Sequence, residues 1–218
     1  ISDLIQSNKF DLLMHFAGFI QVEESVKNPE KYFENNTDNA IKLFNICKKN
    51  GLKNIVFSST AAAYGSVNEI KLIDENTNLN PQNPYAESKI KTEKFLIKNQ
   101  DDFKFIILRY FNVAGADKNL RSGQISKQST HLIKIISEVA TKKRDIIEIF
   151  GKDYNTHDGT AVRDYIHVSD LSDIHVETAK YLLENLNSDI FNCGYGKGFS
   201  VLDVINLANE ICDDKINY

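Results

Sequence analysis

The stretch Asn54-Ile55-Val56-Phe57-Ser58-Ser59-Thr60 carries the clearest signal of the fold. It begins as a short apolar run, which is typical of strands that are buried on both faces of a parallel sheet. Hydroxyl side chains follow at once, and open α/β sheets bind their ligands at the C-terminal ends of the strands. The stretch therefore predicts a buried strand that ends at a ligand-binding crevice.

Other segments of the chain repeat this pattern on both sides of that strand. Strands are predicted at Leu12–Phe16, Phe105–Leu108, Glu148–Gly151 and Phe191–Gly194. Helices are predicted at Asn28–Asn50, Pro84–Asn99 and Val201–Ile211, the last one capped by Ser200. Strands that alternate with helices of this length favour right-handed βαβ units and a parallel sheet. The fold class is therefore α/β.

The segment Pro84-Tyr85-Ala86-Glu87-Ser88-Lys89 carries a pair with chemical potential. Asn83 is a candidate N-cap and Pro84 suits the first helical position, so Tyr85 and Lys89 lie one turn apart on one helix face. An ammonium beside a phenol lowers its pKa, which is ordinarily about 10. Lowering it by about three units requires roughly 4 kcal/mol, and we expect a second positive charge to contribute. Alone, the pair is a weak signal.

Composition limits the function classes. The chain has 218 residues, of which 42% are hydrophobic and 26% charged, and its net charge is -4. It has no large basic cluster, so we expect no nucleic-acid partner. No apolar run approaches the roughly 18 residues that span a bilayer, so we expect no membrane span. Three scattered cysteines without metal-ligand spacing indicate a reduced, cytoplasmic protein and no metal site.

Two further features have competing interpretations. His15 ends a predicted strand, and without a partner at a telling spacing it is interpreted as a structural histidine. Asn35 and Asn36 lie in the middle of a predicted helix, where asparagine is a mediocre helix former. They form either a solvated face or a brace, through Asn35, for a ligand or a neighbouring loop.

Short segments spread over the whole chain carry a family resemblance. They are His15-Phe16-Ala17-Gly18, Glu24-Ser25, Asn35-Asn36, Phe57-Ser58-Ser59-Thr60, Tyr64-Gly65, Pro84-Tyr85-x-x-x-Lys89, Leu108-Arg109-Tyr110-Phe111-Asn112, Ile149-Phe150-Gly151, Asp158-Gly159-Thr160 and Arg163-Asp164-Tyr165-Ile166-His167-Val168. Together they resemble the extended short-chain dehydrogenase/reductase family, and within it the nucleotide-sugar epimerases. Two positions depart from the family pattern, namely Ile20, where some members have lysine, and His131, where others have asparagine.

The resemblance implies a doubly wound, parallel-sheet Rossmann fold that binds NAD, with a smaller mixed α/β substrate domain. We expect residues 1–116 and 164–190 in the NAD-binding part, and residues 117–163 and 191–218 in the nucleotide-sugar part. The chain has no G-x-G-x-x-G phosphate loop. It is therefore expected to be a fragment that begins about 60 to 70 residues into the fold and does not by itself bind NAD tightly.

The resemblance also implies roles for single residues. Tyr85 is expected to be the general base, Lys89 the cation that lowers its pKa and holds the ribose, and Thr60 the hydroxyl against the sugar O4. The implied cofactor contacts are Phe16, Ala17, Gly18, Asn35, Ser58, Tyr85, Lys89, Tyr110 and Phe111. The implied substrate contacts are Thr60, Asn112, His131, Leu132, Glu148, Phe150 and Arg163. The alternative for Arg163 is a surface pair with Asp164.

The implied activity is a reversible, NAD-dependent epimerisation at C4 of a UDP-hexose through a 4-keto sugar. UDP-glucose and UDP-galactose are the expected substrates, with the N-acetyl forms as further candidates. Two alternatives remain. One is another NAD-dependent nucleotide-sugar enzyme (a reductase, decarboxylase or dehydratase), although Ala61 and Ala62 stand where dehydratases carry an Asp-Glu pair. The other is a silent fragment that only binds or dimerises. The family also implies a homodimer that pairs the helices Asn28–Asn50 and Pro84–Asn99.

Overall fold

The computed structural model describes residues 1–66, 72–126, 129–184 and 187–218. These residues divide into two compact units, Ile1–Tyr110 with Asp173–Cys193 and Phe111–Ser172 with Gly194–Tyr218. The expected assignment of NAD to one part and of the nucleotide sugar to the other stays a prediction. Among the described residues, no helix has both the length and the apolar character that crossing a bilayer requires.

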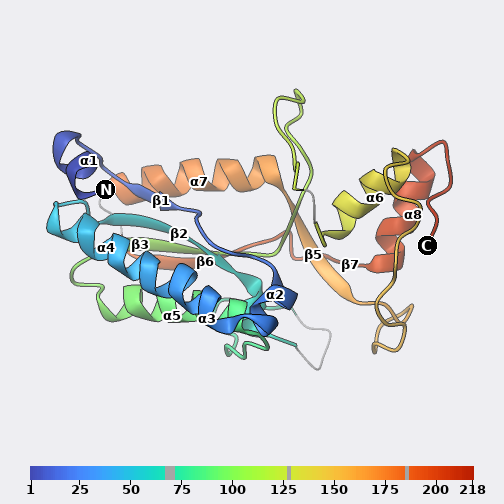
Figure 1. Ribbon diagram of the computed structural model, residues 1–218, viewed down its shortest axis with the longest axis horizontal. Coiled ribbons are helices and arrows are strands. Elements are labelled where there is room, and N and C mark those ends of the chain that lie inside the picture. The colour runs from blue at the N-terminus through green and yellow to red at the C-terminus, as the bar shows by residue number, and fades with distance from the viewer. Residues whose placement is uncertain (67–71, 127–128, 185–186) are drawn as a thin grey trace. The chain divides into compact units, whose positions relative to one another are not determined.

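The first unit is built on a parallel sheet. Its strands lie in the order β1 (Leu13–His15), β2 (Asn54–Thr60), β3 (Lys104–Tyr110) and β6 (Asp189–Cys193), and every neighbouring pair is parallel. The helices α4 (Asn39–Lys49) and α5 (Pro84–Lys98) cover one face, and the part of α7 (Val168–Leu183) from Asp173 onward covers the other (Figure 1). The predicted Rossmann-like α/β sheet is thus confirmed.

The core of this unit follows the two-residue period of its strands. Ile55 and Phe57 of β2 and Phe105 and Ile107 of β3 pack with Phe44 of α4 in one apolar cluster. Alternate residues of a strand point to opposite faces, and Val56, Ile106 and Leu108 between them are also buried. Both faces of β2 and β3 are therefore covered, as continuous apolar runs predict.

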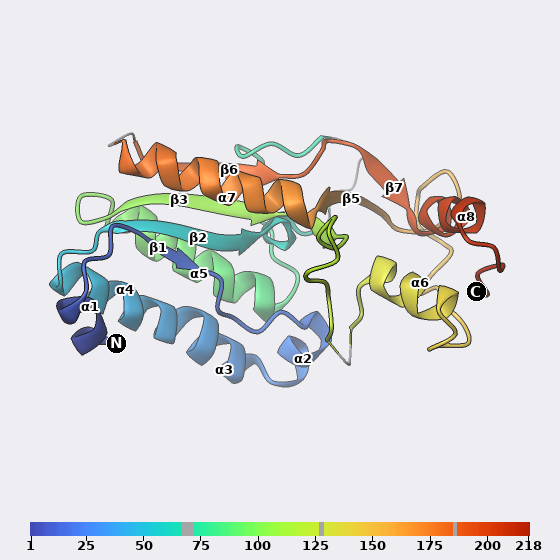
Figure 2. The same ribbon diagram turned by 90° about the horizontal axis from the view of Figure 1, so that it is seen from above.

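The predicted helix Asn28–Asn50 contains a wider turn in its middle. The segment comprises α3 (Pro29–Tyr32), the π-helical turn η1 (Phe33–Asp38) and α4. Asn28 precedes α3, but its side chain makes no capping bond. The shorter helices α1 (Ser2–Ser7) and α2 (Val22–Lys27) lie earlier in the chain (Figure 2). π-Turns within helices are rare and frequently mark functional sites.

The second unit holds a small mixed sheet and two helices. Strand β5 (Val162–His167) pairs in parallel with β4 (Asn112–Ala114) and antiparallel with β7 (Gly198–Ser200). The helices α6 (Leu132–Ala140) and α8 (Val201–Ile211) share an apolar cluster. Ser200 caps α8 as predicted.

One strand prediction is wrong in this unit. Residues 148–151 form no strand, because no neighbouring strand of the described residues pairs with them, and Phe150 is 81% exposed. The predicted strand at Phe191–Gly194 is present in the first unit as β6, whereas the sequence pattern does not predict β7. With three residues, β7 is too short for its alternation to stand out in the sequence.

Candidate active site

The C-terminal ends of β2 and β3 lie side by side and carry polar side chains. Their register pairs Ser58 with Leu108, Ser59 with Arg109 and Thr60 with Tyr110. Thr60 ends the strand, and its hydroxyl accepts a hydrogen bond of 3.2 Å from the backbone N–H of Ala62 in the short 3₁₀ turn η2 (Ala61–Tyr64). The turn fixes the side chain of Thr60 at the edge of the sheet, where the sequence predicts a ligand crevice.

Helix α5 brings Tyr85 and Lys89 to this edge. The helix starts as predicted, with the Asn83 side chain accepting a 2.9 Å bond from the N–H of Ala86 and with Pro84 in the first turn. Lys89 is only 3% exposed, and its Nζ donates a 2.9 Å hydrogen bond to the Ser58 carbonyl. The phenol of Tyr85 interacts with the Thr60 hydroxyl. Tyr85 and Lys89 of one predicted segment and Thr60 of another are thus brought together.

Burial dominates the ionisation of both helix residues. Burial lowers the pKa of Lys89 to about 8, while the nearby Glu93 carboxylate raises it. Burial also raises the pKa of Tyr85, and the Thr60 hydroxyl opposes that shift. In the chain without a bound cofactor, burial thus dominates the pKa of Tyr85. The prediction that Lys89, together with a second positive charge, lowers the pKa of this phenol stays a prediction.

The loop after β1 is held next to Lys89 by Asn36. The side-chain oxygen of Asn36 accepts a 2.8 Å bond from the N–H of Phe19, and its amide donates to the Phe19 carbonyl (3.0 Å) and to the Ser88 hydroxyl (3.1 Å). A Cβ on Gly18 would lie 3.1 Å from the Asn36 oxygen and 3.3 Å from Lys89 Nζ. Position 18 therefore lies close to both groups, which favours a residue without a side chain.

The expected brace is thus provided by the neighbouring asparagine. Asn35 donates a 3.1 Å hydrogen bond to the side-chain oxygen of Asn36. Asn36 itself contacts the loop and α5. Asn36 is 1% exposed. Two adjacent asparagines in a helix are the sequence signal for this arrangement, but they do not show which of the two points inward.

His175 joins the site without any signal in the sequence. Its Nε2 lies 2.6 Å from the Tyr110 hydroxyl, and its ring centroid lies 4.8 Å from that of Phe16. Burial raises the pKa of Tyr110, and interaction with Ser58 opposes the shift. Phe16, Ser58 and Tyr110, all predicted cofactor contacts, therefore form one neighbourhood around a buried imidazole.

The remaining predicted residues belong to the second unit. Asn112 begins β4, His131 precedes α6, Leu132 begins α6, and Arg163 lies on β5; Phe111, Glu148 and Phe150 lie outside helices and strands. No hydrogen bond or ion pair joins any two of these seven residues within the described ranges. Asp164 accepts bonds from the N–H groups of Tyr195 and Gly196 and makes no ion pair with Arg163. The predicted UDP-sugar contacts stay predictions.

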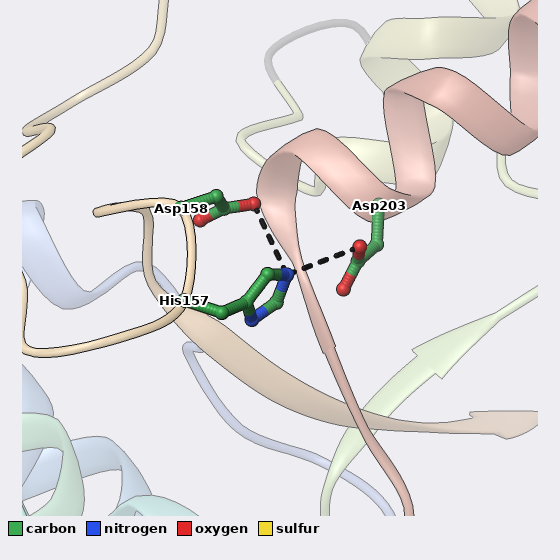
Figure 3. A group of neighbouring side chains, drawn as sticks. All are labelled: His157, Asp158 and Asp203. Atoms are coloured by element: carbon green, nitrogen blue, oxygen red, sulfur yellow. Dashed lines mark hydrogen bonds and ion pairs between the residues drawn. The ribbon is translucent and has the colours of Figure 1, made fainter.

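A separate cluster in the second unit consists of His157, Asp158 and Asp203 (Figure 3). The carboxylate of Asp158 accepts bonds from the N–H and hydroxyl of Thr160 (both 2.8 Å) and from the Ser200 hydroxyl (2.5 Å). Asp203 completes the capping box with Ser200. These bonds tie Asp158 and Asp203 to Thr160 and Ser200, so the cluster helps to organise the start of α8.

Comparisons with known proteins agree with this geometry. Residues 1–194 match the NAD dependent epimerase/dehydratase family. The chain is 43% identical over 215 residues to a UDP-glucose 4-epimerase of Azospirillum brasilense, covering 98% of this chain and 62% of that protein. It is 42% identical to one of Lacticaseibacillus casei, covering 99% of this chain and 66% of the other. The chain thus spans less than two thirds of the length of these relatives.

Solved structures give the same result. The crystal structure of a UDP-glucose 4-epimerase from Brucella ovis in complex with NAD superposes with a TM-score of 0.94 at 32% identity. The match covers 99% of this chain and 67% of that one.

Proposed function

The chain belongs to the NAD dependent epimerase/dehydratase family, and on that premise we propose that it contributes to NAD-dependent, reversible epimerisation of a UDP-hexose at C4. The expected substrates are UDP-glucose and UDP-galactose. One observation carries the proposal: the Tyr85 phenol interacts with the Thr60 hydroxyl one helical turn from the buried Lys89 ammonium. A phenol, a hydroxyl and a fixed cation are the groups that removal of a proton from a sugar alcohol requires.

The residues around Lys89 fit a nicotinamide cofactor. Lys89 is an almost fully buried cation whose one hydrogen bond within the described residues goes to the Ser58 carbonyl, which leaves two of its N–H donors for a ribose. Position 18 beside it carries no side chain, and the adjacent loop is held by Asn36. We therefore propose that Lys89, Phe16, Ala17, Gly18, Asn35, Ser58, Tyr85, Tyr110 and Phe111 hold NAD. When bound, NAD would accept the hydride from C4 of the sugar and would return it to the opposite face of the 4-keto sugar.

The chain's own residues supply the proton chemistry. Tyr85 takes the proton of the C4 hydroxyl and returns it, while Thr60 hydrogen-bonds the same oxygen. Lys89 stabilises the phenolate, but burial raises the pKa of Tyr85. Proton removal therefore needs the positive charge of the oxidised cofactor as well. Tyr85 is expected to be a competent base only while oxidised NAD is bound.

The turn after Thr60 argues against a dehydratase. Elimination of water from the 4-keto sugar needs an acid and a base near C5 and C6, and the residues that follow Thr60 in η2 are Ala61 and Ala62. Neither transfers a proton. The 4-keto sugar is therefore reduced again and not dehydrated.

We further propose that residues of the second unit bind the UDP moiety. Arg163 is an exposed guanidinium on β5, and its planar set of donors suits a diphosphate. Asn112, His131, Leu132, Glu148 and Phe150 complete this proposed set. We also propose a cytoplasmic homodimer that pairs the helical segments 28–50 and 84–99, which light scattering tests directly.

The test uses the purified protein that contains this chain, together with UDP-galactose and UDP-N-acetylgalactosamine in separate reactions. UDP-glucose is expected to form from UDP-galactose without added reductant. The Tyr85→Phe variant is expected to lose at least a hundredfold in rate, because the base is absent. Tyr154→Phe is the matched control, since Tyr154 is 50% exposed. Accumulation of a dehydrated or decarboxylated product would refute the proposal.

A further inference from the structure

A buried ion pair lies directly behind the proposed active site. Glu93 of α5 and Arg109 of β3 have side chains that are 1% and 4% exposed, and Arg109 Nη2 lies 2.7 Å from Glu93 Oε2. Arg109 Nε donates a second bond, of 3.2 Å, to Oε1 of the same carboxylate. Arg109 Nη1 donates a third bond, of 2.8 Å, to the Tyr64 hydroxyl. The catalytic scheme uses neither charge of this pair.

The pair is connected to the site through two residues. Glu93 follows Lys89 by four positions, as Lys89 follows Tyr85, so the three side chains share one face of α5. Glu93 also accepts a hydrogen bond from the hydroxyl of Ser59. Ser59 lies between Ser58, whose carbonyl binds Lys89, and Thr60, whose hydroxyl contacts Tyr85. The Glu93 carboxylate is therefore linked both to α5, which carries Tyr85 and Lys89, and to the end of β2, which carries Thr60.

We propose that Glu93 is a positioning residue that keeps Lys89 in its ammonium form and fixes the end of β2, while Arg109 holds the carboxylate in place. The inference deepens the proposed function, and it rests on that function only in treating Lys89 as the partner of Tyr85. A buried ammonium with a neutral carbonyl as its partner loses its proton readily, because burial favours the uncharged amine. A carboxylate one turn away counteracts this effect.

The charges that face Lys89 support a dominant role for Glu93. Burial lowers the pKa of Lys89 to about 8, and Glu93 is the charged group that raises it. His15 of β1 interacts electrostatically with Lys89 and is neutral near pH 7, since its own pKa is about 4. The buried residues of η1 and α2, which pack on α5, are the uncharged Asn36, Thr37 and Ser25.

The remaining neighbours of α5 add no competing buried carboxylate. Tyr32 of α3 is a phenol whose pKa is raised to about 12, and the Tyr64 phenol of η2 has a pKa that burial also raises. The charged residues of η1, Glu34 and Asp38, are exposed. Within the described residues, Glu93 is thus the buried carboxylate that acts on Lys89.

The experiment measures the pKa of Lys89 directly in the purified protein that contains this chain. Lysine labelled with ¹³C at Cε is incorporated, and its NMR signals are followed from pH 6 to pH 11. Lys89→Arg identifies the signal of interest by its loss. Glu93→Gln is expected to lower the pKa of Lys89 by on the order of one unit. Arg109→Gln is expected to raise it, because the carboxylate loses its competing partner.

The opposite signs separate electrostatic positioning from simple packing. Both variants break the same ion pair, so a purely structural role would move the pKa of Lys89 in one direction or not at all, and either result would overturn the proposal. The double variant Glu93→Leu/Arg109→Met removes both charges at similar volume, which guards against a single variant that does not fold. There too the pKa of Lys89 is expected to fall. Because this readout needs no substrate turnover, failure of the proposed epimerisation would leave it interpretable.

Discussion

Lys89 Nζ lies 2.9 Å from the backbone carbonyl oxygen of Ser58, so the main chain of β2 holds the cation that α5 supplies. A backbone acceptor changes position only if the strand moves. The position of the ammonium is therefore determined by the packing of α5 on β2 and not by the conformation of a surface side chain. It follows that the site forms when α5 packs on the sheet.

Removing this ammonium is expected to weaken cofactor binding. Lys89→Met keeps an unbranched apolar chain but removes a charged donor, and hydrogen bonds of charged groups contribute about 1.5 to 3 kcal/mol. The dissociation constant for NAD is expected to rise by about tenfold to a hundredfold, as measured by calorimetry on the protein that contains this chain. Lys94→Met, an exposed position on the same helix, is the control. Equal affinities in the two variants would remove Lys89 from the cofactor site.

Stability is expected to depend on pH through His15. This histidine is 6% exposed, its ring lies near those of Phe44 and Phe57, and burial lowers its pKa from 6.5 to about 4. Between those two pH values His15 is protonated in the unfolded chain and neutral in the folded chain. The free energy of unfolding is therefore unaffected by His15 above pH 6.5 and falls as the pH decreases toward 4.

The corresponding measurement compares urea unfolding at pH 7.5 and pH 5.0. The loss of unfolding free energy on acidification is expected to be about 2 kcal/mol smaller in His15→Phe than in the unmodified chain. His131→Gln replaces an exposed histidine and serves as the control. If His15→Phe and the unmodified chain lose equal stability, His15 is not a buried neutral imidazole.

The Asn36 brace is expected to be costly to remove. Asn36→Ala loses bonds to both backbone groups of Phe19 and to Ser88, and leaves those groups without their partner. Unfolding free energy is expected to fall by about 3 kcal/mol, while Asn35→Ala, which loses a single bond, costs about 1 kcal/mol. The comparison is made by urea unfolding. If Asn35→Ala lowers the unfolding free energy more than Asn36→Ala does, then Asn35 and not Asn36 is the residue that holds the loop.

Ser200 is expected to stabilise the second unit through two bonds. Its hydroxyl accepts from the N–H of Asp203 and donates to Asp158. Ser200→Ala therefore loses a helix cap and a buried bond, and a reduction of about 1 to 2 kcal/mol in unfolding free energy is expected. Ser122→Ala, at an exposed loop position, provides the comparison. A cost no greater than that of Ser122→Ala would show that the cluster in Figure 3 does not organise the start of α8.

Local patterns predicted the sheet and the residues at its edge. Continuous apolar runs gave β2 and β3, and the cap at Asn83 with Pro84 gave the start of α5 and hence the positions of Tyr85 and Lys89. These features are determined by residues that are close together in the chain, so a short stretch of sequence is enough to predict them.

Long-range pairing accounts for what was missed. His175 reaches Tyr110 across 65 positions and Asn36 reaches Ser88 across 52, and no local pattern connects such residues. The predicted strand at 148–151 failed for a related reason. Its apolar residues had the right character, but no neighbouring strand is available to pair with them within the described chain.

The proposed function requires that hydrogen leaves C4 of the sugar as a hydride and returns to the same carbon, while Tyr85 moves only the proton. The most direct measurement uses UDP-galactose that carries deuterium at C4, incubated in ordinary water with the protein that contains this chain. UDP-glucose that retains the deuterium at C4 is the expected product. UDP-glucose with ordinary hydrogen at C4 would show exchange with solvent, which the proposed hydride transfer does not allow.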